Sequence, residues 1–154
     1  PFVNSLRSPS GDLDSDGNAD EFTTLSDVWG FANYHEFSFG SKADPEGNIW
    51  VALCLSKSYE SLEPFRGWAL KVTPDGRTIP VASGVRSPCG VGPNAAGAMF
   101  YAESQGPWNG SCSLKHLKQG GFMGHPASFN WYDLAPEMGE RPVEPNTRSR
   151  LEPV

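Results

Sequence analysis

The chain has 154 residues and a net charge of −6. This length suits one domain with its own core, and the negative charge disfavours nucleic acid or an anionic membrane as a partner. No apolar run reaches the roughly 18 residues of a membrane span. Aromatic residues make up 12% of the chain, which argues against disorder, and 17 glycines with 14 prolines indicate many turns.

An acidic stretch near the start carries oxygen-bearing side chains at every second position, namely Asp12, Asp14, Asp16, Asn18 and Asp20. Gly17 stands where a calcium loop needs its sharp turn, and calcium binds six to eight oxygens, so the spacing predicts a calcium site. Position twelve of this loop is Thr23, not the Glu of the helix–loop–helix calcium site. The alternative is a solvated acidic turn in which Asp and Asn cap their own backbone.

Apolar alternation and turn residues then recur without a helical period. Six strands are expected, at 36–39, 49–54, 68–72, 78–82, 98–102 and 113–117. The run Ile49–Leu55 is almost continuously apolar and should be buried on both faces, and Pro74-Asp75-Gly76 predicts a hairpin turn. No helix longer than about two turns is expected. From Asp133 the chain is rich in Pro, Glu and Arg, which predicts an extended tail or a truncated linker.

Two segments 50 residues apart repeat one pattern: Gly47-Asn-Ile-Trp-Val-Ala and Gly97-Ala-Met-Phe-Tyr-Ala. A period of about 40 to 50 residues with several short strands is typical of propeller blades. The predicted fold is therefore all-β: a partial β-propeller over residues 1–132, with about two full four-stranded blades plus flanking pieces, followed by the tail at 133–154. Closed propellers have roughly four to eight blades, so the chain is expected to be a piece of a longer protein.

The three cysteines, Cys54, Cys89 and Cys112, have no metal-binding spacing. A disulfide between Cys89 and Cys112 is one expectation if the protein is exported. Three buried free thiols are the other, because Cys packs as a small hydrophobe.

Three motifs carry a family resemblance: Arg86-Ser87-Pro88-Cys89-Gly90, Glu103-Ser104-Gln105-Gly106-Pro107, and Gly120-Gly121-Phe122-Met123-Gly124-His125-Pro126. Their order resembles the calcium- and quinone-binding blade of the glucose/sorbosone dehydrogenase family. Those proteins are six-bladed β-propellers that use pyrroloquinoline quinone. The chain is most similar to related propeller domains of large secreted bacterial proteins that also carry haem domains. The resemblance is clear over residues 86–126 and weaker over 12–85.

The resemblance implies a periplasmic or extracellular dehydrogenase that oxidises a sugar or alcohol and passes electrons to a cytochrome c-like domain. The carbonyls of Gly106 and Pro107 would bind calcium, which prefers oxygen ligands. Arg86, with Ser87 beside it, would bind the quinone, because a guanidinium forms a fork that suits carboxylates. His35 would be the base that takes the hydroxyl proton of the substrate.

Trp108 and Asn109 would line the sugar site by stacking and hydrogen bonding, or would pack the loop. Departures from the family pattern favour a second reading: a non-catalytic, calcium-stabilised propeller that binds carbohydrate or protein. Ser87 stands where the family often has Asn, and His125 where it often has Trp. His35 would then be a structural histidine and Arg86 a surface arginine. The family's other cofactor-binding residues would follow Val154, so this chain alone is expected to bind quinone poorly and to be inactive.

Overall fold

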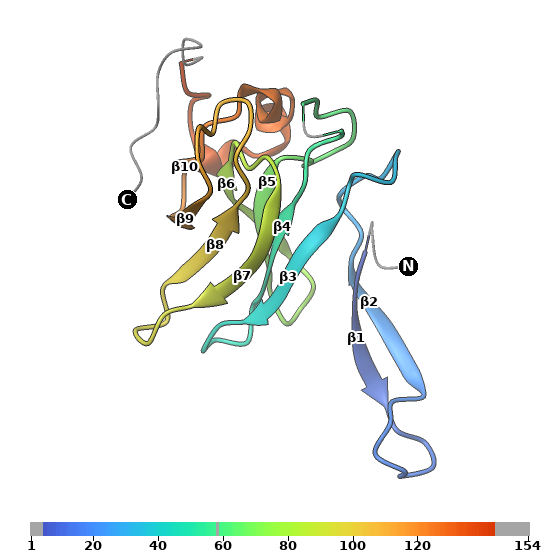
Figure 1. The fold of residues 1–154 in the computed structure, drawn as a ribbon. Coiled ribbons are helices and arrows are strands. Elements are labelled where there is room, and N and C mark those ends of the chain that lie inside the picture. Colours follow the sequence, from blue (N-terminus) through green and yellow to red (C-terminus); the bar gives the residue numbers. More distant parts are fainter. Residues whose placement is uncertain (1–4, 58, 144–154) are drawn as a thin grey trace.

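A computed structural model describes residues 5–57 and 59–143, and this part of the chain is mostly β-structure (Figure 1). Its strands are β1 (Leu6–Gly11), β2 (Glu21–Ser26), β3 (Ser38–Ala43), β4 (Ile49–Leu53), β5 (Trp68–Val72), β6 (Thr78–Ser83), β7 (Pro88–Pro93), β8 (Met99–Glu103), β9 (Ser113–His116) and β10 (Gly121–Phe122). Two 3₁₀ helices follow, η1 (Pro126–Leu134) and η2 (Pro136–Met138). The predicted all-β class is confirmed.

The described strands form three sheets. β1 and β2 form a hairpin, β10-β6-β5-β4-β3 is the order of the second sheet, and β7-β8-β9 is the order of the third. Neighbouring strands are antiparallel, except that β10 is parallel to β6. Each of the six expected positions holds a strand, although the first begins at Ser38 and not at residue 36. β2, β7 and β10 were not among the expected strands.

The 50-residue repeat corresponds to two similar hairpins, β3–β4 and β7–β8. In the first turn Asp44 Oδ1 accepts hydrogen bonds from the amides two and four residues further on. Asn94 Oδ1 accepts from the amides at the same spacing in the second turn. Gly47 and Gly97 have φ angles of 82° and 84°, a left-handed conformation that favours glycine. The repeated sequence therefore makes the same turn twice.

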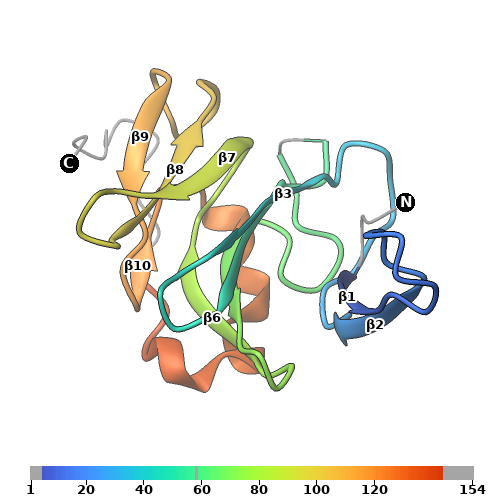
Figure 2. The ribbon, with the colours of Figure 1, turned by 90° about the horizontal axis from the view of Figure 1, so that it is seen from below.

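The sheets lie in chain order, from β1–β2 through β3–β6 to β7–β9 (Figure 2). One core covers one face of the β3–β6 sheet, where Val51, Leu53, Trp68, Leu70 and Val72 pack with Trp29, the helical segment and Leu6 of β1. A second core lies between the last two sheets and includes Ala52, Ala69, Ala82, Val91, Met99, Tyr101 and Leu117. Successive residues of β4 enter opposite cores, so the expected burial of this strand on both faces is confirmed.

The helical segment contradicts two expectations. η1 has nine residues, about three turns of 3₁₀ helix, and it crosses the predicted boundary at residue 132. Residues 133–138 are not extended, because Ala135 and Met138 pack in the first core. Trp68 Nε1 donates to the Ser128 carbonyl at 2.9 Å, and this tertiary contact holds a helix that has no amphipathic signal of its own. Residues 144–154 of the expected tail lie outside the described residues.

None of the helices in the described part of the chain has the length and hydropathy required to cross a bilayer.

The cysteines also differ from expectation. All three are free; Cys54 is buried, whereas Cys89 and Cys112 are exposed. Cys89 lies on β7 and Cys112 directly precedes β9, with β8 between these strands. Strands two places apart are separated by about 9 to 10 Å, and a disulfide needs Cα atoms within about 7 Å. Neither the disulfide nor three buried thiols is therefore found.

Candidate functional site

The candidate site lies where the loop after β8 meets the segment between β6 and β7. The guanidinium of Arg86 crosses this junction, and its Nη1 donates to the carbonyls of Ser104 at 3.2 Å and Gln105 at 2.7 Å. A Cβ atom on Gly106 would lie 2.1 Å from Arg86 Cζ, so the guanidinium packs directly on the glycine backbone. Two residues that the family resemblance assigns to cofactor binding are thus brought together.

Glu103, at the end of β8, is only 2% exposed and stabilises this junction through hydrogen bonds. Its carboxylate accepts the backbone amides of Arg86 at 3.1 Å and Ser87 at 2.6 Å, and the Tyr101 hydroxyl at 2.7 Å. Lys115 Nζ lies 4.0 Å from the carboxylate. Burial, followed by the nearby Glu103 charge, raises the pKa of Tyr101 well above its usual value, so the hydroxyl remains a donor.

The Arg86 guanidinium has an incomplete set of partners. Among residues 5–57 and 59–143, no carboxylate lies within 4 Å of it, and its buried Nε has no hydrogen-bond partner. A half-buried cation that is bonded only to carbonyls lacks the counter-charge that normally offsets its desolvation. This arrangement favours an anion, and a carboxylate matches the guanidinium fork.

His125 lies beside this cation and is 5% exposed. Its Nδ1 accepts the Ala127 amide at 3.2 Å and caps η1, and its ring stands edge-on to Trp108 at 6.4 Å between centroids. Burial, with the Arg86 charge as the second cause, lowers the pKa of His125 from 6.5 to about 4. The imidazole is therefore neutral at pH 7 and is a weak base there.

The loop itself is closed by its own hydrogen bonds. Gly106 and Asn109 exchange backbone bonds of 2.7 and 2.9 Å, and Asn109 Nδ2 donates to the Ser104 carbonyl at 2.9 Å. The Gly106 carbonyl, an expected calcium ligand, therefore already accepts one bond and keeps one lone pair. Pro107 is exposed and Trp108 is half-buried with a φ of 63°. Asn109 thus shapes the loop whether or not it also contacts a substrate.

His35 lies on a different loop, residues 27–37. Its backbone amide donates to Asn33 Oδ1 at 3.0 Å, and its half-buried ring lies 4.1 Å from that of Tyr34. Within the described chain, no hydrogen bond or ring contact joins His35 to Arg86. The structure brings Arg86, Ser87, Gly106 and Asn109 together, whereas the contacts of His35 are local.

A buried ion-rich cluster that the sequence analysis missed holds the loop of His35. The fully buried Glu36 accepts the Asn33 amide at 3.0 Å and the Ser56 hydroxyl. Arg66, also fully buried, donates to the Gly30 carbonyl at 2.7 Å and to the Glu36 carbonyl. Burial lowers the pKa of Arg66 to about 10, and the Glu36 charge opposes this shift. A lone arginine between Phe65 and Gly67-Trp68 was the signal that could have revealed this cluster.

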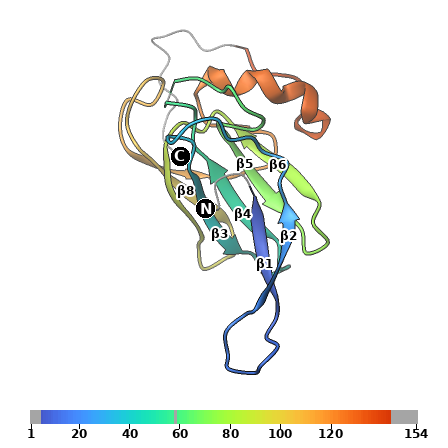
Figure 3. The same cartoon turned by 90° about the vertical axis from the view of Figure 1, so that its right-hand side faces the viewer.

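The acidic loop lies at the far tip of the β1–β2 hairpin, well away from the β7–β9 sheet (Figures 1 and 3). Carboxylate oxygens of Asp12, Asp14 and Asp20 lie within 4.8 Å of one another and are exposed. Asp16 instead accepts the Asn18 amide at 2.7 Å and its side chain at 3.0 Å, and these bonds lower the pKa of Asp16. Three of the five expected ligands therefore converge, and Asp16 pairs with Asn18.

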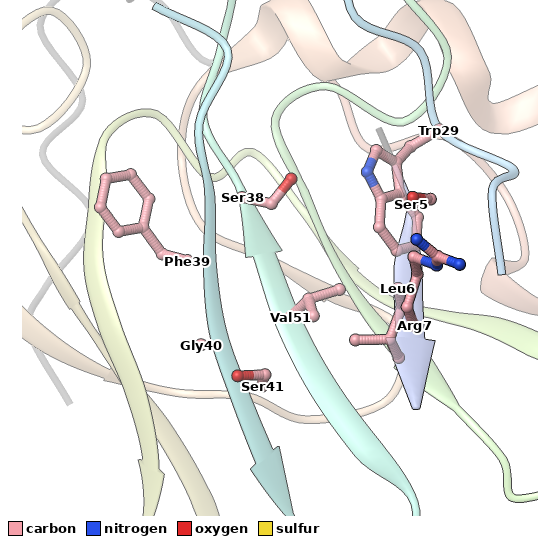
Figure 4. Close-up of a pocket in the computed structure, with 9 residues that line it drawn as sticks. All are labelled: Ser5, Leu6, Arg7, Trp29, Ser38, Phe39, Gly40, Ser41 and Val51. Carbon is pink, nitrogen blue, oxygen red and sulfur yellow. The ribbon is translucent and has the colours of Figure 1, made fainter. Parts of the chain in front are cut away.

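A pocket of about 230 Å³ lies between β1 and β3 (Figure 4). It is lined by Ser5, Leu6, Arg7, Trp29, Ser38, Phe39, Gly40, Ser41 and Val51. Leu6, Trp29 and Val51 belong to the first core, so the floor of the pocket is apolar. None of the residues predicted for catalysis or cofactor binding lines this pocket.

Comparison with known proteins finds no matching family model, curated protein or solved structure. Any functional assignment therefore depends on the chemistry of the sites described above.

Proposed function

We propose that this chain is part of a secreted, quinoprotein-like dehydrogenase and that its sheets are blades of a β-propeller. Three consecutive sheets support this fold, the second and third packed against each other through β3, β4 and β7. In this reading β3–β6 is one complete blade, β7–β9 belongs to the next, and β1–β2 is the outer half of the preceding blade. The 50-residue repeat and its duplicated turn give the same spacing.

The observation that carries the proposed activity is the Arg86 guanidinium, which has no carboxylate partner among residues 5–57 and 59–143 and whose buried Nε has no hydrogen-bond partner there. A carboxylate of pyrroloquinoline quinone would supply the counter-charge that this guanidinium lacks among the described residues, with Ser87 alongside. The free lone pair of the Gly106 carbonyl, together with the Pro107 carbonyl, suits a calcium ion. When bound, the quinone supplies an acceptor for hydride from a sugar or alcohol, and calcium supplies a Lewis acid.

In this proposal His35 takes the hydroxyl proton of the substrate, and Trp108 with Asn109 contacts the sugar or alcohol. The electron acceptor would be a cytochrome c-like domain. His125 is the weaker candidate for the base, because its Nδ1 already caps η1 and its pKa is about 4. Residues from further blades would complete the site, so this chain alone should bind the cofactor weakly and show no turnover.

A second candidate function is a non-catalytic propeller that is stabilised by calcium and binds carbohydrate or protein. The convergence of Asp12, Asp14 and Asp20 favours calcium at the hairpin tip, far from the Arg86 junction, where it would have a structural role. The local contacts of His35 favour the same reading.

The test is a calorimetric titration of the chain with pyrroloquinoline quinone in calcium buffer. Arg86→Gln should weaken binding by about tenfold or more, because charge-assisted hydrogen bonds contribute about 1.5 to 3 kcal/mol. The matched control is Arg77→Gln, since Arg77 is exposed and pairs with Asp75 at 3.1 Å in a surface turn. Equal affinities of the wild type and Arg86→Gln would reject the quinone site. The non-catalytic binding propeller would then be the better-supported function.

A further inference from the structure

The first and second sheets leave two strand edges facing one pocket. β1 pairs with β2 on one side, and no described strand pairs with its other edge. β3 is likewise the terminal strand of its sheet. The pocket in Figure 4 lies between these two edges and has Leu6, Trp29 and Val51 in its lining. The edge of β1 that no described strand pairs with lies beside an apolar pocket floor, and such an edge is suited to bind another strand.

The hairpins β1–β2 and β5–β6 occupy equivalent positions along the chain: β1–β2 comes before the sheet that begins with β3, and β5–β6 comes before the sheet that begins with β7. Each hairpin directly precedes the first strand of the next sheet. Each turn contains Asp-Gly, with φ angles of 90° at Gly17 and 86° at Gly76. Each ends in a buried serine, Ser26 or Ser83. By this comparison β1 corresponds to β5.

β5 has a partner on the edge that corresponds to the edge of β1 with no described partner. This partner is β4, which pairs antiparallel with β5 and aligns Val51 with Leu70. Trp50 of β4 faces away from the first core and packs against the second core, which lies toward the following sheet. A strand of the β4 type on the edge of β1 would direct its equivalent of Trp50 toward the β3–β6 sheet. The pocket of about 230 Å³ occupies this position and can receive one aromatic side chain.

We propose that the free edge of β1, together with this pocket, is an acceptor site for an extended β-strand of the β4 type. Main-chain hydrogen bonds to β1 supply affinity, and alternate side chains of the bound strand enter the pocket. Pro9 lacks an amide donor and limits pairing to the residues before it, which agrees with the pocket lining of Ser5, Leu6 and Arg7. The inference rests on the repeated-sheet part of the proposed fold and not on the cofactor chemistry.

The probe is a synthetic peptide with the sequence of residues 44–53, Asp-Pro-Glu-Gly-Asn-Ile-Trp-Val-Ala-Leu. Hydrogen exchange of the whole chain is measured with and without this peptide. Amides in the segment 6–8 should exchange about tenfold more slowly at saturation, whereas those of β7–β9 should not change. The matched control peptide carries Pro in place of Val51, which removes a donor and breaks strand pairing.

Ser41→Arg places a large charged side chain at the pocket and should weaken peptide binding about tenfold. The matched control is Ser10→Arg, because Ser10 lies on the same hairpin beyond Pro9 and outside the pocket lining. This variant should leave the affinity for the peptide unchanged. The inference is wrong if the peptide does not bind, if the Pro peptide binds equally well, or if residues 6–8 are not protected. Protection that rises with chain concentration without peptide would mean that a second copy occupies the edge. Quinone binding measured on the same chain separates these outcomes from the proposed dehydrogenase function.

Discussion

The pH dependence of stability should follow the buried imidazole of His125. Its pKa is about 4 in the folded chain, against an ordinary value of 6.5 in the unfolded chain. As the pH falls below 6.5 the unfolded chain binds the proton first, so the folded state loses stability until the pH passes about 4. The pKa difference corresponds to about 2 kcal/mol lost between pH 7.5 and 5.0 and about 3 kcal/mol in full.

The assay is urea unfolding of the wild type and His125→Asn at pH 7.5 and at pH 5.0. Asn keeps a side-chain oxygen that can accept the Ala127 amide and cap η1, but it does not titrate. The free energy of unfolding of the wild type should therefore fall by about 2 kcal/mol more than that of the variant. Equal losses in both proteins would refute the assignment of His125 as a buried, neutral imidazole.

Three further changes test the core, the site and the acidic loop. Leu70→Ala, at a fully buried position in the first core, should lower the free energy of unfolding in urea by about 2 to 5 kcal/mol; a change below about 1 kcal/mol would contradict the packing. Gly106→Ala should displace the Arg86 guanidinium and lower the free energy of unfolding by about 1 to 3 kcal/mol. Gly110→Ala should lower it less, because a Cβ at Gly110 has open space around it. Similar thermal midpoints of the two variants would reject the contact between Gly106 and Arg86. Calorimetric titration with calcium should show binding to the wild type and to Asp27→Asn, and no binding to Asp14→Asn. If the wild type gives no heat of binding, the loop is a solvated acidic turn and not a calcium site.

Six of the ten described strands were predictable because their signals are local. Alternation, apolar runs and Asp-Gly turns are written in neighbouring residues, and the duplicated turn at Asp44 and Asn94 could be read from the repeat. η1 was missed because tertiary contacts, such as the bond from Trp68 to the Ser128 carbonyl, hold it. No short-range pattern reports such a contact.

The candidate site was predictable only in part, for a related reason. The family motifs named both Arg86 and Gly106, and the structure places the guanidinium of Arg86 against the Gly106 backbone. The roles of Glu103 and His125 depend on burial, which composition and spacing do not reveal. The placement of His35 depends on the path of a long loop that the buried pair Glu36 and Arg66 fixes.

The proposed function depends most on one group: the Arg86 guanidinium should bind a carboxylate of the ligand. The most direct measurement is the proton–nitrogen NMR signal of Arg86 Nε, assigned by its loss in Arg86→Lys, during titration with pyrroloquinoline quinone and calcium. Quinone binding at this group should produce a saturable downfield shift of this signal, together with shifts at the Gly106 amide, because the guanidinium gains a charged partner. An Nε signal that does not move while the quinone binds elsewhere, or does not bind, would contradict the account.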